Sequence, residues 1–188
     1  MTAWSVSPIM ADMSTAVQPH SMTVEEFLER PERWDGNHEE LIEGEIYLSP
    51  NNKPRHNIVV DRIQERLQPL KKQGFVVLGE VACRVSDSSL PNTDVAVIRQ
   101  DRWEANGLDN FLPESPALVV EVASPNQMRK LLNKAALYLE YGAEQVWIAY
   151  PQKRVVQVLS ADGSREAREA ETVEFHGIVI PVSEIFPA

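Results

Sequence analysis

Apolar side chains recur every three or four positions through two long segments, a spacing that predicts amphipathic helices. In residues 55–74 the apolar stripe consists of Ile58, Val59, Ile63, Leu67 and Leu70. In residues 126–142 it consists of Met128, Leu131, Leu132, Ala135 and Tyr138 or Leu139. Each helix is expected to end at a glycine, Gly74 or Gly142, and Pro69 is expected to kink or shorten the first one.

Shorter apolar runs, rich in β-branched residues, predict strands at 75–86, 93–98, 117–124 and 144–151. The run at 117–124 is apolar almost throughout, which indicates a strand buried on both faces. Hairpins are predicted at 39–50, with a turn at Glu43–Gly44, and at 154–167, with a turn at Asp162–Gly163.

The remaining segments complete the predicted fold. A short helix is expected within 22–31, capped by Thr23 and ended by Pro31. Residues 99–115 are mostly polar and are interpreted as a loop, and short strands near 171–180 close the chain.

The order of these elements predicts an α/β or α+β fold. The segment 117–151 reads strand, helix, strand, and a right-handed crossover would make its two strands parallel. Around this unit we expect a mixed central sheet with helices on both faces. The 188 residues are 43% apolar, which suits one core, so we expect a flexible tail at 1–21 and a single domain at 22–188.

Charge and cysteine content narrow the functional classes. The net charge of −10 argues against strong non-specific binding to nucleic acid, because such binding needs a basic footprint. Nucleic-acid contacts would therefore depend on local basic runs, such as those at 52–56 and 128–134. The single cysteine, Cys83, excludes an internal disulfide and is expected to be buried.

Targeting and membrane signals are absent from the sequence. No apolar run approaches the ~20 residues that a membrane-spanning helix requires. The first residues contain neither a basic start nor a continuous apolar stretch, so no secretory signal is predicted. We therefore expect a cytoplasmic protein.

The carboxylate of Glu121 interrupts the apolar run of residues 118–123. An isolated buried carboxylate is so unfavourable that it must be paired, neutralised or bound to a metal. A strand end that lets Glu121 reach solvent or a basic residue is the ordinary explanation. Asp94 lies in another predicted strand of the same sheet, and the two carboxylates would form a Mg²⁺ site if these strands are neighbours.

The helix after this strand supplies a candidate cation. Ala123 lies on the same face of the strand as Glu121 and leaves space beside it. Lys134 lies about two turns into the helix, and it would reach this space if the helix packs over the strand. An ordinary exposed helix lysine is the other interpretation.

Several of these segments together resemble the Uma family of restriction-endonuclease-like proteins, which is abundant in cyanobacteria and belongs to the PD-(D/E)XK nuclease superfamily. The segments are MTVEEFLERPE, EELIEGEIYLSPNNKPRHNIVVDRI, TDVAVI, PALVVEVASP and KAALYLEYGAEQVWIAYP, and the resemblance covers residues 22–187. It implies a restriction-endonuclease-like core with added N-terminal strands and a C-terminal hairpin, and metal-dependent hydrolysis of DNA phosphodiesters.

The resemblance also implies roles for individual residues. Asp94 and Glu121 match the two metal-binding acidic positions of the superfamily, and the Val122 carbonyl would complete the shell of a Mg²⁺ ion, with Mn²⁺ as a substitute. Ala123 takes the usual lysine position, and the lysine has moved to the helix as Lys134.

Further residues match the family outside this core motif. Glu40 matches an upstream acidic residue that would bind the metal or position water. His56 and Arg55, in the PRH segment, would contact the substrate, although a structural role for His56 at the helix start is an equal alternative.

The chain departs from the family pattern at three points. Thr93 replaces the proline next to the aspartate, Leu131 or Leu132 replaces an aspartate, and the segment before the lysine is one residue shorter. These departures leave Lys130 as an alternative to Lys134.

Two hypotheses of different classes follow. The first is a Mg²⁺-dependent endonuclease that cuts DNA as a symmetric homodimer, since cutting both strands usually requires two active sites. The second is a binding or regulatory module that keeps the nuclease fold with little catalysis, which the net acidity favours.

Overall fold

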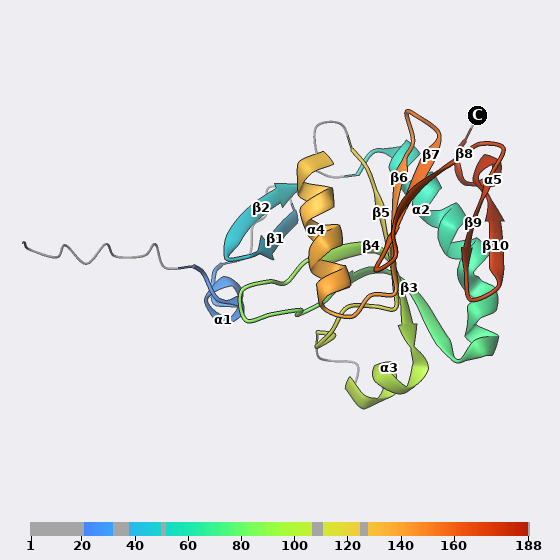
Figure 1. The fold of residues 1–188 in the computed structure, drawn as a ribbon. Helices are drawn as coiled ribbons and strands as arrows, with labels where there is room; N and C mark the ends of the chain where they lie inside the picture. Colours follow the sequence, from blue (N-terminus) through green and yellow to red (C-terminus); the bar gives the residue numbers. More distant parts are fainter. Residues whose placement is uncertain (1–20, 32–37, 50–51, 107–110, 125–127, 188) are drawn as a thin grey trace, which may run out of the picture.

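The computed structural model describes residues 21–31, 38–49, 52–106, 111–124 and 128–187 (Figure 1). The predicted N-terminal tail, apart from Ser21, lies outside these residues. The strands are β1 (His38–Ile42), β2 (Glu45–Ser49), β3 (Phe75–Ala82), β4 (Asn92–Arg99), β5 (Leu118–Val122), β6 (Gln145–Tyr150), β7 (Val155–Ser160), β8 (Gly163–Arg168), β9 (Thr172–Phe175) and β10 (Ile178–Pro181). The helices are α1 (Val24–Leu28), α2 (Pro54–Leu67), the 3₁₀ helix η1 (Gln68–Gln73), α3 (Gln100–Asn106), α4 (Met128–Glu140) and α5 (Val182–Ile185).

A six-stranded sheet with the order β3-β4-β5-β6-β7-β8 forms the centre of the fold. Strands β5 and β6 are parallel, and every other neighbouring pair is antiparallel. The parallel pair is joined by α4, which is the predicted strand–helix–strand unit. The predicted mixed sheet between helices is therefore confirmed.

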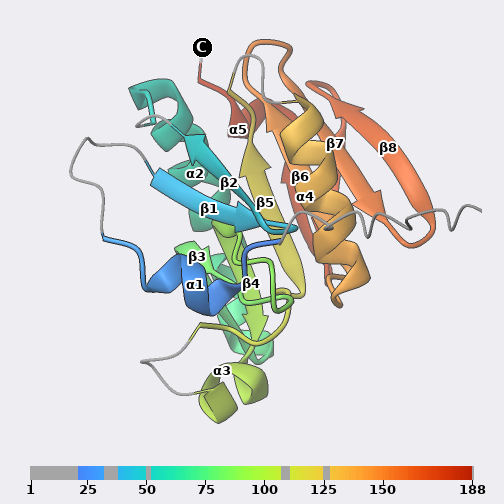
Figure 2. The ribbon, with the colours of Figure 1, turned by 90° about the vertical axis from the view of Figure 1, so that its left-hand side faces the viewer.

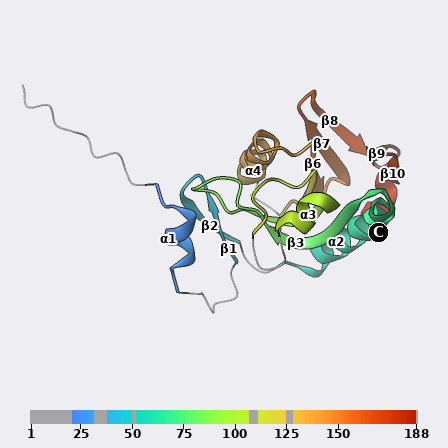
Figure 3. The same cartoon turned by 90° about the horizontal axis from the view of Figure 1, so that it is seen from below.

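Helices cover both faces of this sheet (Figures 1 and 3). Residues of α2, such as Val59 and Ile63, pack with Val120 and Trp147 on one face, together with the C-terminal elements β9, β10 and α5. Residues of α4 pack with Val119, Val146 and Ile148 on the other face. Because alternate residues of β5 face opposite sides, Glu121 lies on the α4 side with Val119.

The hairpin of β1 and β2 forms a separate two-stranded sheet and crosses the α4 side of β4 and β5 (Figure 2). Its turn at Glu43–Gly44, predicted from the sequence, has positive φ at both positions, 51° and 78°. A backbone bridge between Leu41 and Leu90 joins the hairpin to the segment before β4. The hairpin is thereby held over the end of the central sheet.

The predicted buried stripes were only partly correct. In α4, Leu131, Ala135 and Tyr138 are buried as expected, but Met128 and Leu132 are exposed. Lys134, by contrast, is buried. Apolar periodicity could not anticipate this, because the burial of Lys134 depends on the carboxylates of Glu40 and Glu121, which belong to other elements. In α2, Ile58 is exposed although its neighbour Val59 is buried, because consecutive residues of a helix point in directions about 100° apart.

Two further local predictions needed correction, and a third was confirmed. The expected loop at 99–115 contains α3, whose lack of buried residues explains why no apolar pattern marked it. The expected shortening of the helix at 55–74 is confirmed, because it is α-helical only to Leu67 and continues as the 3₁₀ helix η1 up to Gly74. Pro69 cannot donate an α-helical hydrogen bond. The second hairpin turns at Ala161–Asp162, since Ser160 pairs with Gly163.

Two remaining expectations concern burial and the membrane. Cys83 is fully buried, as predicted. Among the described residues, no helix combines the length and the apolar character needed to cross a membrane.

Candidate active site

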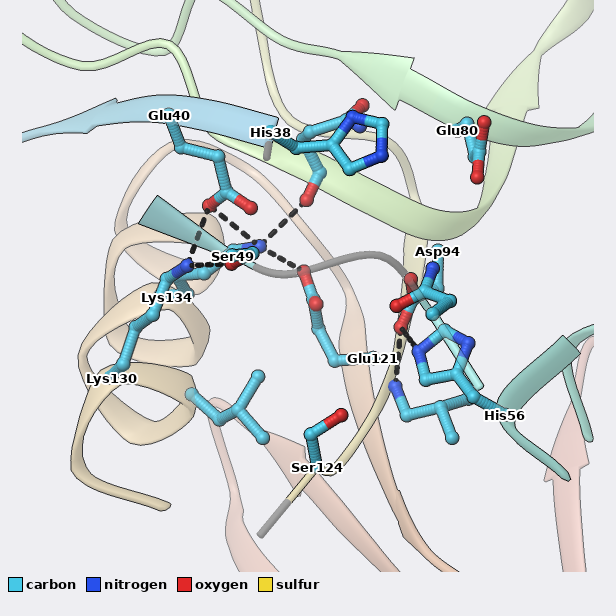
Figure 4. A pocket seen from close by; sticks show the side chains of 14 residues that line it. His38, Glu40, Ser49, His56, Glu80, Asp94, Glu121, Ser124, Lys130 and Lys134 are labelled. Carbon is cyan, nitrogen blue, oxygen red and sulfur yellow. Dashed lines mark hydrogen bonds and ion pairs between the residues drawn. The ribbon is translucent and has the colours of Figure 1, made fainter. Parts of the chain in front are cut away.

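The pairing of β4 with β5 places the two predicted acidic residues opposite each other. Val95 pairs with Val120 and Ala96 with Val119, so one further step of the antiparallel register brings Asp94 level with Glu121. Residues directly opposite each other project from the same face of a sheet. Both carboxylates accordingly line one hollow of about 60 Å³ at this end of the sheet (Figure 4).

Asp94 is held by groups from both sides. Its Oδ2 accepts a hydrogen bond of 2.6 Å from the Val122 amide, and it lies 3.2 Å from Nε2 of His56. Burial lowers the pKa of His56, but the hydrogen bond and charge of Asp94 outweigh it and raise this pKa above its ordinary value. The Nδ1 atom of His56 is buried, without a hydrogen-bond partner among the described residues.

Glu121 is 4% exposed and is stabilised by two side chains of α4. The Tyr138 hydroxyl donates a hydrogen bond of 3.2 Å to its Oε1, and Nζ of Lys134 lies 2.8 Å from the same oxygen. Burial raises the pKa of Glu121 to about 7; Lys134 opposes this shift, while Asp94 and Glu40 add to it. The buried carboxylate is therefore tolerated because α4 supplies a cation and a hydrogen-bond donor.

Lys134 is surrounded by three oxygen atoms. Besides Glu121, its Nζ donates a hydrogen bond of 2.6 Å to the carbonyl of Asn92 and forms an ion pair of 3.1 Å with Oε2 of Glu40. Burial would lower the pKa of Lys134, but the charges of Glu121 and Glu40 outweigh burial and raise it. Of the two lysines that the sequence left open, Lys134 is the one beside Glu121.

The β1–β2 hairpin brings Glu40 and Ser49 to this cluster. The Oε2 atom of Glu40 lies 3.6 Å from Nζ of Lys130, which donates a hydrogen bond of 2.8 Å to the Ser49 hydroxyl. Burial lowers the pKa of Lys130, although the charge of Glu40 opposes this. The four-residue spacing of Lys130 and Lys134, which places both on one helix face, was the available sequence signal for this second cation.

Sequence reasoning did not single out Ser49, Asn92 or Tyr138 as parts of the site. Ser49 and Asn92 reach the lysines only through the tertiary arrangement of the hairpin and β4, so no local pattern marked them. Of the predicted substrate-binding residues, His56 lines the hollow, whereas Arg55 is exposed on α2 and is not among the lining residues.

The donor atoms at the hollow fit a hard divalent cation. Oδ1 of Asp94 and Oε2 of Glu121 have no hydrogen bond or ion pair with the described residues, which leaves one carboxylate oxygen on each strand. Within the described part of the chain, no group of three or more His, Cys, Asp or Glu residues is arranged to hold a metal. An ion here would thus keep most of its water ligands, as Mg²⁺ commonly does.

The chain matches a protein family by its sequence and a solved structure by its fold. The sequence profile of the Uma2 family, described as "Putative restriction endonuclease", matches residues 24–188. The solved structure is described as a putative nuclease belonging to DUF820 from Anabaena variabilis ATCC 29413. It is 20% identical with a TM-score of 0.77, and the match covers 87% of this chain and 97% of that one, a likeness of fold. No curated protein sequence matches the chain.

Proposed function

Because the chain belongs to the Uma2 family, we propose that it is a Mg²⁺-dependent endonuclease that hydrolyses DNA phosphodiester bonds. The observation that carries the proposal is the position of Asp94 and Glu121, which face each other across neighbouring strands and line one hollow. Each has a carboxylate oxygen with no partner among the described residues. This donor set suits an ion that positions water and neutralises phosphoryl charge.

Each residue around such a site would have its own role. Asp94, Glu121 and the Val122 carbonyl would hold Mg²⁺, or Mn²⁺ as its substitute. Bound there, the ion would lower the pKa of a coordinated water and stabilise charge on the phosphoryl group. His56 holds the Asp94 carboxylate from the side of α2, and Lys134 keeps Glu121 in place.

DNA binding by an acidic chain requires local cations near the site. Lys53 and Arg55 are exposed at the start of α2, one turn or less from His56, which lines the hollow. They are suited to phosphates flanking the scissile bond, where each cation adds to affinity in a salt-dependent way. The symmetric homodimer expected from the sequence stays a prediction, which light scattering on the purified protein measures.

A catalytically weak binding module is the second candidate, and one observation favours it. Lys134 and Tyr138 already stabilise Glu121 within the protein, so the carboxylate does not need a metal to be tolerated. Calorimetry with Mn²⁺ separates the two candidates. An endonuclease of this design binds Mn²⁺ through Asp94 and Glu121 and gives a heat of binding. A module without metal chemistry binds no Mn²⁺ and gives none.

The proposed activity is tested with supercoiled plasmid and linear duplex DNA in the presence of Mg²⁺, Mn²⁺ or a chelator. We expect cleavage that depends on the divalent ion and falls roughly a hundredfold or more in Glu121→Gln and Asp94→Asn. Glu174→Gln, which changes an exposed glutamate of β9, is the matched control and should cut like the unaltered protein. Absence of cleavage with every divalent ion, or full activity in Glu121→Gln, would contradict the proposal.

A further inference from the structure

The ammonium of Lys134 is closely surrounded by protein oxygens in this structure. A lysine ammonium carries three N–H donors. Around Nζ of Lys134 lie three oxygens, from Asn92, Glu121 and Glu40, at 2.6, 2.8 and 3.1 Å. Its side chain is only 2% exposed. A phosphate oxygen at this ammonium would compete with these protein oxygens.

Lys130 lies one helical turn before Lys134 and is differently placed. Its Nζ makes one hydrogen bond, to Ser49, and its distance of 3.6 Å to Glu40 exceeds hydrogen-bonding range. Among the described residues it has no other polar partner, so N–H donors remain available. Its side chain is 13% exposed, and it lines the same hollow as Asp94 and Glu121.

The charges of the side chains that line the hollow also favour a second cation facing the substrate. Four carboxylates, those of Glu40, Glu80, Asp94 and Glu121, line the hollow together with Lys130 and Lys134. Lys134 lies within ion-pair distance of two of these carboxylates. An anionic phosphodiester that enters the hollow would meet net negative charge unless another positive group faces it.

We infer that Lys130 is the cation that contacts the phosphate undergoing cleavage, and that Lys134 is a positioning residue for Glu121. The inference rests on the proposed nuclease function and names the group that touches its substrate. Lys134 ties α4 to β4 through Asn92 and to β1 through Glu40, which fixes the Glu121 carboxylate between them.

The β1–β2 hairpin gives Lys130 its orientation. Ser49 accepts its hydrogen bond, and the Tyr47 ring lies 5.6 Å from its Nζ, within the range of a cation–π interaction. Both residues belong to β2. The hairpin would therefore hold the ammonium at the rim of the hollow, where a phosphate can reach it while the aliphatic stem stays covered.

The test compares Lys130→Met, Lys130→Arg and Lys134→Met, with Lys72→Met as the control at an exposed lysine of η1. Three properties are measured for each: cleavage of a duplex with Mg²⁺, Mn²⁺ affinity by calorimetry, and binding of a fluorescent DNA duplex with Ca²⁺ in place of Mg²⁺. All are measured at a temperature at which circular dichroism shows the variant folded.

We expect Lys130→Met to keep the Mn²⁺ affinity of the unaltered protein within about threefold, while kcat falls roughly a hundredfold. Lys130→Arg should regain part of kcat, because it restores a donor cation. Lys134→Met should weaken Mn²⁺ binding by about tenfold or more, since Glu121 loses the group that orients it. Lys72→Met should resemble the unaltered protein in all three measurements.

The outcomes separate this inference from the proposed function. Cleavage by Lys130→Met at the unaltered rate would overturn the role of Lys130 and leave the nuclease proposal standing. If the unaltered protein cuts no DNA, the nuclease proposal fails, and duplex binding then tests the role of Lys130. Weaker binding of the duplex by Lys130→Met than by Lys72→Met supports Lys130 as a phosphate contact. Equal binding by the two variants overturns that role. Should Lys130→Met not fold, Lys130→Gln takes its place under the same criteria.

Discussion

At the scale of single residues, the site is a balance of buried charges. Glu121 is ionisable in an apolar strand, and its burial would be costly without Lys134 and Tyr138. Removing one partner of such a group leaves the other buried and unpaired, which costs more than the pair contributes. The stability of the protein should therefore respond strongly to small changes around this carboxylate.

The Tyr138 hydroxyl offers the mildest change of this kind. Tyr138→Phe removes a hydrogen bond to Glu121 without changing the packing of the ring, so the free energy of unfolding should fall by about 1–3 kcal/mol. Urea denaturation measures this difference. Tyr141→Phe, at a more exposed tyrosine just beyond α4, is the control and should change the stability by less than about 0.5 kcal/mol. Equal effects of the two changes would show that the hydroxyl of Tyr138 does not support Glu121.

Cys83 provides a pH-dependent prediction away from the carboxylates. Burial raises the pKa of the Cys83 thiol to about 12, so almost no reactive thiolate exists between pH 7 and 9 in the folded protein. We expect no reaction of the folded protein with Ellman's reagent at pH 8, and one equivalent of thiol after unfolding in urea. Rapid reaction of the native protein would show that the cluster around Cys83 opens readily.

At the scale of elements, α4 has two functions that its sequence combines. One face packs on β5 and β6 through Leu131, Ala135 and Tyr138. The same face also delivers Lys134 to the carboxylates, because position 134 lies one turn from both 131 and 138. Helical periodicity was therefore visible in the sequence, while the choice of buried residues depended on what lies opposite.

Two adjacent leucines of α4 test this assignment of faces. Leu131 is 4% exposed and Leu132 is 38% exposed, although apolar periodicity placed both in the buried stripe. Leu131→Ala should lower the free energy of unfolding by about 2–5 kcal/mol, because it leaves a cavity between α4 and the sheet. Leu132→Ala should change it by less than about 0.5–1 kcal/mol. Chemical denaturation of both variants checks the order, and a larger effect at Leu132 would contradict the packing of this helix.

At the scale of the whole molecule, the site assembles five separate parts of the chain. Strands β4 and β5 supply Asp94 and Glu121, α4 supplies the lysines, α2 supplies His56, and the β1–β2 hairpin supplies Glu40 and Ser49. The net charge of the whole chain is −10, so attraction of DNA would depend on the basic groups around this hollow.

A divalent ion bound at this junction would stabilise the whole fold. Because it binds the folded state alone, Mg²⁺ at a hundred times its dissociation constant should raise the melting temperature by about 5–10 °C. The shift should vanish in Asp94→Asn and persist in Glu174→Gln, as thermal denaturation in Mg²⁺ and in chelator would show. A shift of the same size in Asp94→Asn would place the ion elsewhere.

Much of this arrangement was predictable because the sequence encodes local periodicity. The strand that carries Glu121 and the helix that carries Lys134 followed from apolar spacing, and the parallel pair followed from the strand–helix–strand order. Helix α3 was missed because none of its residues is buried, and no apolar pattern could mark it. The contacts of Ser49 and Asn92 were missed because each depends on a partner far away in the sequence.

The sequence by itself determined the succession of strands and helices and the central mixed sheet, and it marked Asp94 and Glu121 as candidate site residues, because these depend on patterns within short segments. The tertiary structure alone decided that Lys134 is enclosed while Lys130 stays open at the rim. The physical reason is that the exposure of a lysine is set by the acceptors that other elements bring to it, here β1, β2 and β4, and no spacing within its own helix records them.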